Sequence, residues 1–132
     1  MSFTPIHQHL IIKAHSTVPI TSPAKAQVFL TDLVKLLGMV PVTEPQAVYV
    51  SEPGNEGLTG SINLATSHIA FHVWDKIGLL MIDIYSCKEF SNIEVINFID
   101  KMWSIDTLSW KVLDRNETGL YDHAVTISQA TE

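Results

Sequence analysis

Residues Ser67 to Trp74 constrain the fold most strongly, because their side chains follow the alternation of a β-strand. In a regular strand, one face carries Ser67, Ile69, Phe71 and Val73, and the other carries His68, Ala70, His72 and Trp74. Ser67 and His72 then lie on opposite faces, and they approach each other only if Ser67 sits at the strand entrance, where the backbone is free to turn. A serine at a strand entrance with a histidine just inside it is an unusual arrangement for packing alone.

Cap and turn signals predict two helices and six strands. Ser22-Pro23 is typical of a helix start, with serine as N-cap and proline at the first helical position, and Gly38 ends that helix. Ser91-Asn92 opens a second apolar-striped helix, and residues 76–78 indicate a hairpin turn. We expect helices over 23–37 and 92–103 and strands over 7–14, 47–50, 59–65, 67–74, 79–86 and 108–113. The tail from Asn116 is too polar to assign.

This order of elements predicts an α+β fold, a two-layer sandwich in which two helices cover one face of an antiparallel sheet. The chain has 132 residues, which suits a single domain spanning 1–132. Its hydrophobic fraction of 46% is high for such a length and favours burial of further surface in an oligomer.

Charge and cysteine content exclude several classes of protein. The formal net charge of -6, without a Lys/Arg cluster, argues against a nucleic-acid partner. A single cysteine excludes an internal disulfide framework, so we expect a cytoplasmic protein. Neither a signal peptide nor an apolar run long enough to span a membrane is visible, so we expect no membrane partner.

Four short segments together resemble the short prokaryotic S-adenosylmethionine decarboxylase family. They are Leu58-Thr59-Gly60-Ser61, Ser67-His68-Ile69, His72-Val73-Trp74 and Asp83-Ile84-Tyr85-Ser86-Cys87. The family signature runs Ser-Gly, then Glu-Ser-His-x-x-x-His-Thr-Trp-Pro-Glu, then a strand that ends in Cys. The spacing from the pivotal serine to the cysteine is the same here. The resemblance continues weakly along nearly the whole chain.

The resemblance implies a proenzyme that cleaves itself between Thr66 and Ser67, giving chains 1–66 and 67–132. Ser67 would become a pyruvoyl group at the new N-terminus. Decarboxylation of an amino acid leaves a carbanion that no ordinary side chain can hold, so a carbonyl that forms a Schiff base must act as electron sink. A chain that makes this carbonyl from its own serine requires neither a further cofactor nor a metal.

Three more catalytic roles are implied by position within the family signature. His72 matches the histidine that moves protons during processing, a task suited to imidazole near neutral pH. Thr59 stands where the family has a hydroxyl residue that assists processing. Cys87 matches the thiol that returns a proton to the substrate carbon after carbon dioxide leaves.

The residues expected to bind substrate are where this chain departs from the family. Trp74-Asp75-Lys76 stands where the family has Trp-Pro-Glu. That Glu is expected to accept hydrogen bonds from the ribose hydroxyls of S-adenosylmethionine. The Lys76 ammonium has the opposite charge and is a donor, so it cannot accept them. Asp75 lies one position away and takes the place of that Glu only if the turn after Trp74 has a different shape from the family's. Tyr49 supplies the adenine-stacking aromatic ring only if the loop containing Pro53 is an insertion. Thr66 also replaces the Glu that normally precedes the cleaved serine.

Taken singly, the same residues have simpler interpretations. Ser67 is typical of a turn or cap, Cys87 of a small buried residue, and His68 with His72 of core histidines or half of a metal site that needs ligands from elsewhere. Together, at the family's spacing, they favour decarboxylation of S-adenosylmethionine, a small-molecule substrate, for polyamine (spermidine) biosynthesis by a homodimer. The alternatives are decarboxylation of ornithine or arginine, and an unprocessed, inactive homologue that acts as a binding partner.

Overall fold

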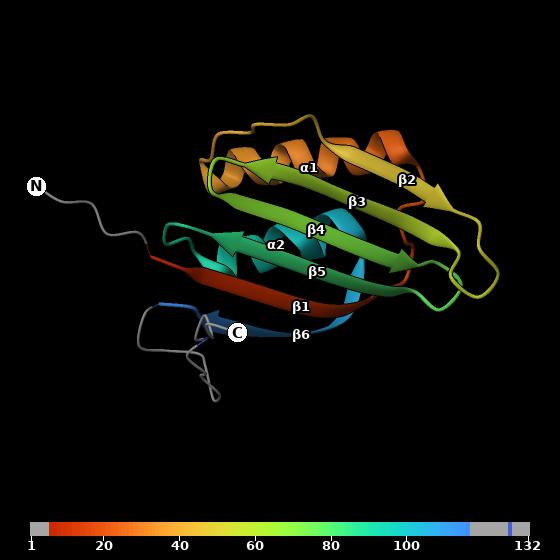
Figure 1. Ribbon diagram of the computed structural model, residues 1–132. Helices are drawn as coiled ribbons and strands as arrows, with labels where there is room; N and C mark the ends of the chain where they lie inside the picture. The colour runs from red at the N-terminus through yellow and green to blue at the C-terminus, as the bar shows by residue number, and fades with distance from the viewer. Residues whose placement is uncertain (1–5, 117–126, 128–132) are drawn as a thin grey trace, which may run out of the picture.

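The computed structural model describes residues 6–116 and 127, and within them one sheet is packed on two helices (Figure 1). The strands run in the order β2-β3-β4-β5-β1-β6, and every neighbouring pair is antiparallel. The predicted α+β two-layer sandwich is therefore confirmed. In chain order the elements are β1 (Gln8–Ser16), α1 (Pro23–Leu37), β2 (Gln46–Val50), β3 (Gly57–Leu64), β4 (Ser67–Trp74), β5 (Leu79–Ser86), α2 (Asn92–Trp103) and β6 (Ile105–Asp114).

Local capping explains why both helices begin and end where the sequence predicts. The Ser22 hydroxyl accepts the backbone N–H of Lys25, and Gly38 adopts a left-handed conformation with φ of 65° at the C-terminal end of α1. In α2 the Ser91 hydroxyl accepts the N–H of Glu94, and Ser104 ends the helix with φ of 52°. The caps satisfy backbone groups that a helix leaves unpaired at its ends.

Four of the predicted elements, 23–37, 67–74, 79–86 and 92–103, have the predicted bounds. The other strands differ by one to three residues at their ends. The strand predicted over 108–113 begins at Ile105, because the chain leaves the left-handed Ser104 directly into the sheet and pairs Ile105 with Ser16. The strand predicted over 59–65 ends at Leu64, because Ala65 lies in the following turn. The tail from residue 117 lies outside the described residues, apart from residue 127.

An aromatic cluster joins both helices to the centre of the sheet. Phe29 of α1 contacts Phe71 of β4 edge-on, with ring centroids 5.8 Å apart, and Trp103 of α2 at 5.3 Å. Phe71 and Trp103 also contact each other at 5.6 Å, and all three side chains are fully buried. Because Phe71 faces the helices, the alternation of β4 turns His68, Ala70 and His72 to the opposite face.

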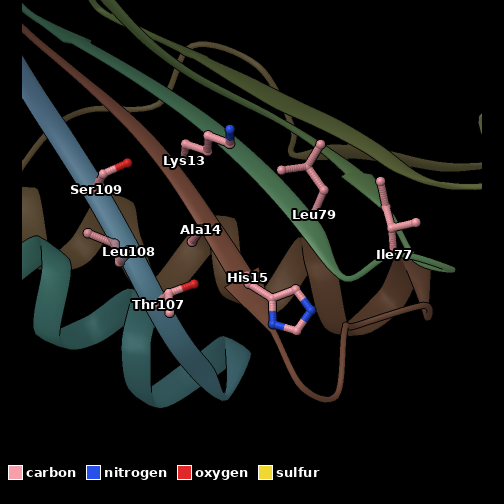
Figure 2. Close-up of a pocket in the computed structure, with 8 residues that line it drawn as sticks. All are labelled: Lys13, Ala14, His15, Ile77, Leu79, Thr107, Leu108 and Ser109. Carbon is pink, nitrogen blue, oxygen red and sulfur yellow. The ribbon is translucent and has the colours of Figure 1, made fainter.

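We call this opposite, helix-free side of the sheet the outer face. Ile11 of β1 and Met81 of β5 lie partly exposed on it, beside His72. A hollow of about 530 Å³ lies at one end of β1 and β6, and Figure 2 shows His15 and Leu79 among its lining residues.

Neither described helix is long and apolar enough to cross a membrane.

Replacing Phe29 by alanine should lower the free energy of unfolding by about 4 kcal/mol, because it leaves a cavity between two helices and β4. The neighbouring Val28 is 54% exposed, so Val28→Ala is the matched control and should change the free energy of unfolding by less than about 0.5 kcal/mol. Urea denaturation followed by circular dichroism measures both values. Equal losses in the two variants would contradict the central role of the cluster.

Candidate active site

The bond expected to be cleaved lies at the end of a two-residue hairpin turn. Leu64 of β3 pairs with Ser67 of β4, so Ala65 and Thr66 form the turn between them. Thr66 has φ of 59°, a left-handed conformation that is sparsely populated by β-branched residues. The Thr66–Ser67 peptide bond therefore joins an exposed, unfavourable turn residue to the first residue of a strand.

Ser67 and Thr66 both contact Cys87, which directly follows β5. The backbone N–H of Cys87 donates to Ser67 Oγ at 3.0 Å, and Thr66 Oγ1 donates to Cys87 Sγ at 2.8 Å. The Ser67 side chain is 6% exposed and belongs to the face that packs toward the helices. Twenty residues apart in the sequence, the predicted nucleophile and thiol thus share one end of the hairpin.

These contacts lower the pKa of the Cys87 thiol from its ordinary value. The largest cause is the hydrogen bond from the Thr66 hydroxyl, followed by the Ser67 hydroxyl, while desolvation of the thiol opposes them. The Cys87 backbone and the nearby positive charge of Lys88 lower the pKa further. Hydrogen bonds and positive charge favour the thiolate because they stabilise its negative charge.

Thr59 and His72 form a second pair, on the outer face. They lie directly opposite each other on β3 and β4, and Thr59 Oγ1 is hydrogen-bonded to His72 Nδ1 at 3.0 Å. Trp74 lies on the same face, with its ring centroid 6.3 Å from that of His72. The two residues predicted to assist processing are therefore adjacent, and both are exposed.

Within one chain this second pair does not reach Ser67. The strand β4 begins at Ser67 itself and stays regular, so Ser67 and His72 lie on opposite faces. Five residues of extended chain separate them by roughly 16 Å along the strand. The structure thus divides the predicted catalytic residues into two groups, Ser67 with Cys87 and Thr59 with His72.

The residues predicted to bind substrate contact the loop between β2 and β3. Trp74 Nε1 donates to Asn55 Oδ1 at 3.0 Å, and the Tyr49 hydroxyl donates to Asp75 Oδ2 at 2.5 Å. The latter bond, to a carboxylate, is the main reason that the pKa of Tyr49 is raised. These three predicted residues lie at the end of β4 remote from Ser67.

Lys76, the fourth of them, is paired with a carboxylate that the sequence did not identify. Its Nζ donates to Glu56 Oε2 at 2.9 Å, and this bond raises the pKa of Lys76 and lowers that of Glu56. Glu56 therefore places a negative charge directly against the Lys76 ammonium. The signal available in the sequence was only a turn-rich loop with one more acidic residue.

The family model for S-adenosylmethionine decarboxylase matches residues 8–116, which contain every residue discussed above. The chain belongs to this family. Its relatives include the S-adenosylmethionine decarboxylase proenzymes of Picrophilus torridus, 31% identical over 74 residues, and Archaeoglobus fulgidus, 30% identical over 71 residues. The matches cover 55% and 54% of this chain, and they span 57% and 62% of the two relatives.

A solved structure also shares the fold of this family member. The adenosylmethionine decarboxylase of Aquifex aeolicus superposes with a TM-score of 0.71 over 95% of this chain and 100% of that chain. The two sequences are 19% identical in this superposition, so the likeness concerns the arrangement of the elements.

A cluster of titratable side chains that sequence reasoning did not connect surrounds Tyr85. The Tyr85 hydroxyl is hydrogen-bonded to His7 Nδ1 at 2.6 Å, and its ring lies 5.6 Å from that of His68. His9, which is hydrogen-bonded to Asp83, packs edge-on against the same ring. In the part of the chain that the structure describes, no three His, Cys, Asp or Glu side chains are placed to hold a metal ion, so His68 has an aromatic neighbour there rather than fellow ligands.

Because Cys87 is the sole cysteine in the chain, its alkylation by iodoacetamide reports on one thiol. The thiolate is the reacting form, so the midpoint of the rate against pH should lie lower in the folded protein than in the same protein unfolded in urea. Intact mass reads the adduct separately on cleaved and uncleaved chains. A folded midpoint at or above the unfolded one would contradict the contacts described around the sulfur.

Proposed function

We propose that this member of the family is a pyruvoyl-dependent decarboxylase that forms by self-cleavage between Thr66 and Ser67. Its proposed substrate is S-adenosylmethionine, and its product would supply aminopropyl groups for polyamine (spermidine) biosynthesis. The observation that carries the proposal is that Cys87 contacts both residues of the Thr66–Ser67 bond. Its backbone N–H binds the Ser67 hydroxyl, and its thiol contacts the hydroxyl of the left-handed Thr66. One residue supplies the reactive group, and the other supplies a proton.

The residues around the turn fit the formation of a pyruvoyl group. Ser67 Oγ attacks the carbonyl carbon of Thr66, the C–N bond breaks, and an ester replaces the amide. Loss of the Ser67 α-proton then breaks the Cβ–O bond, which leaves a carboxylate on Thr66, and addition of water with release of ammonia makes the new carbonyl. The left-handed backbone of Thr66 favours cleavage, because an unfavourable conformation is released when the Cβ–O bond breaks and the chain separates.

Cys87 has the geometry for the later proton transfer. Its sulfur is within hydrogen-bonding distance of the residue at the cleavage point, and its backbone N–H holds Ser67 Oγ. The pyruvoyl group would supply the electron sink for loss of carbon dioxide. The Cys87 thiol would then return a proton to the carbon of a substrate bound to the group formed from Ser67.

The separation of Ser67 from the Thr59–His72 pair leads us to include a second copy of the chain. In a homodimer whose interface includes the outer face and the exposed turn at residues 65–66, Thr59 and His72 of one protomer would assist cleavage of the Thr66–Ser67 bond of its partner. Apolar side chains on this face support the arrangement: Ile11 and Met81 are 36% and 41% exposed in the single chain. Burial of such side chains is a general driving force for association.

The substrate end supports one alternative. Asp75 and Glu56 place two carboxylates near Trp74, and carboxylates suit the amine of a small basic amino acid as well as the hydroxyls of a ribose. Ornithine or arginine is therefore the second candidate substrate. Release of carbon dioxide from carboxyl-labelled S-adenosylmethionine, ornithine and arginine distinguishes the three, and release from none of them would favour the inactive binding partner.

Substitution of Ser67 and substitution of Cys87 should block different steps, self-cleavage in the first case and decarboxylation in the second. Ser67→Ala removes the nucleophile, so the chain should remain a single species without activity. Cys87→Ala keeps the nucleophile and should still cleave at least in part, but decarboxylation should slow by about 10²-fold or more because the proton donor is lost. Intact mass and labelled carbon dioxide measure the two steps. Decarboxylation by Ser67→Ala would refute the mechanism, as would a wild-type chain that never cleaves.

Mixing two inactive variants tests the shared site. Ser67→Ala and His72→Ala chains, one of them carrying a tag, are unfolded together and refolded. In mixed dimers the His72→Ala chain keeps Ser67 and receives His72 from its partner, so this chain alone should be cleaved. If each chain used its own His72, neither variant would be cleaved in the mixture, and the proposal of a composite site would be wrong.

A further inference from the structure

The segment around Cys87 is held by contacts outside the strand ladder. Cys87 follows the last residue of β5, and its polar atoms are bound by two other segments, residues 66–67 and Ile6. Its N–H donates to Ser67 Oγ, its sulfur accepts from Thr66, and its carbonyl accepts the N–H of Ile6 at 3.1 Å. The position of the sulfur therefore depends on how the chain bends on either side of this residue.

Ser86 fixes the bend on the N-terminal side. Its side chain is fully buried, which is costly for a hydroxyl without partners. Both of its hydrogen-bonding capacities are used by Lys88: Ser86 Oγ donates to the Lys88 carbonyl at 2.5 Å and accepts the Lys88 N–H at 3.0 Å. These two hydrogen bonds link Ser86 to Lys88 across Cys87. Cys87 therefore lies at the apex of a three-residue bend.

Lys88 fastens the same bend to a helix. Its Nζ donates to the carbonyl of Gly38 at 2.8 Å, fifty residues away in the sequence. Gly38 is the C-terminal cap of α1, where carbonyl groups lack partners within the helix and the helix dipole favours a positive charge. An exposed lysine is thus used to join the end of α1 to the residue next to Cys87.

Three segments close into a ring of hydrogen bonds at this end of the sheet. Lys88 joins residues 86–88 to Gly38, and the Val40 carbonyl accepts the N–H of Ala65 at 2.9 Å. Thr66 Oγ1 then joins the turn to Cys87 Sγ. The ring runs from the end of α1 to the turn at residues 65–66, on to Cys87, and back to α1.

We propose that Ser86 and Lys88 are positioning residues that hold the Cys87 sulfur against the turn at the cleavage point. Ser86 sets the shape of the bend, and Lys88 braces it on the C-terminus of α1. The proposal deepens the proposed function, on which it rests for the role of the thiol as proton donor. A proton donor must approach one carbon and not its neighbour, so the orientation of the sulfur would govern where the proton goes.

Alkylation of the single thiol tests the role of Lys88. In Lys88→Met the side chain keeps its length but loses the bond to Gly38 and the charge, so the pH midpoint of iodoacetamide alkylation should rise. A rise of half a pKa unit slows alkylation about threefold below the midpoint. Lys88→Arg should restore the wild-type profile. Lys35→Met removes an exposed positive charge from the same helix end without touching Cys87, and its profile should match the wild type.

A second pair of variants tests Ser86. Ser86→Ala should shift the profile in the same direction, and Ser86→Thr, which keeps the hydroxyl, should restore it. If thermal unfolding shows that Ser86→Ala does not fold, the alkylation profiles of the Lys88 variants test the proposal instead. An unchanged profile in Lys88→Met, or an equal shift in Lys35→Met, would overturn the proposal. The adduct is read by intact mass on whole or cleaved chains, so a failure of cleavage refutes the proposed function without affecting this test.

Discussion

The packing of Phe71 between Phe29 and Trp103 is the interaction on which the rest of the structure depends. It joins both helices to β4 through fully buried rings, which contribute more to stability than any exposed ion pair in the described residues. It also decides which side of β4 faces the helices. Since side chains alternate along a strand, the burial of Phe71 turns His72 outward and leaves Ser67 on the inner face.

That constraint explains why the predicted catalytic residues form two groups. Ser67, at the beginning of β4, is close to Cys87 because β4 and β5 are antiparallel neighbours, so the start of one strand meets the end of the other. His72 is close to Thr59 because β3 lies on the other side of β4. Each pair is fixed by register, and no rotation of a side chain can unite the two. The proposed homodimer would unite them from two different protomers.

The fold also shows which contacts are made by the residues that depart from the family pattern. Thr66 replaces a glutamate, and its hydroxyl donates a hydrogen bond to the Cys87 sulfur. A glutamate side chain would bring a negative charge in place of this hydroxyl donor. Lys76 replaces another glutamate, and Glu56 is hydrogen-bonded to it from a different loop. The first change places a hydroxyl against the thiol, whereas the second pairs a lysine with a carboxylate from another loop.

The sequence by itself determined both helices, the strand that begins at Ser67 and the strand that ends just before Cys87. Caps, turns and side-chain alternation are local signals, formed by residues that are close together in the sequence. The resemblance of its short segments to the family signature also predicted catalytic roles for Ser67, Thr59, His72 and Cys87. Only the tertiary structure decided that Glu56 pairs with Lys76, that three histidines gather around Tyr85, and that Lys88 reaches Gly38. These contacts join residues 17 to 78 positions apart, and they follow from strand order and loop path, which no local pattern encodes.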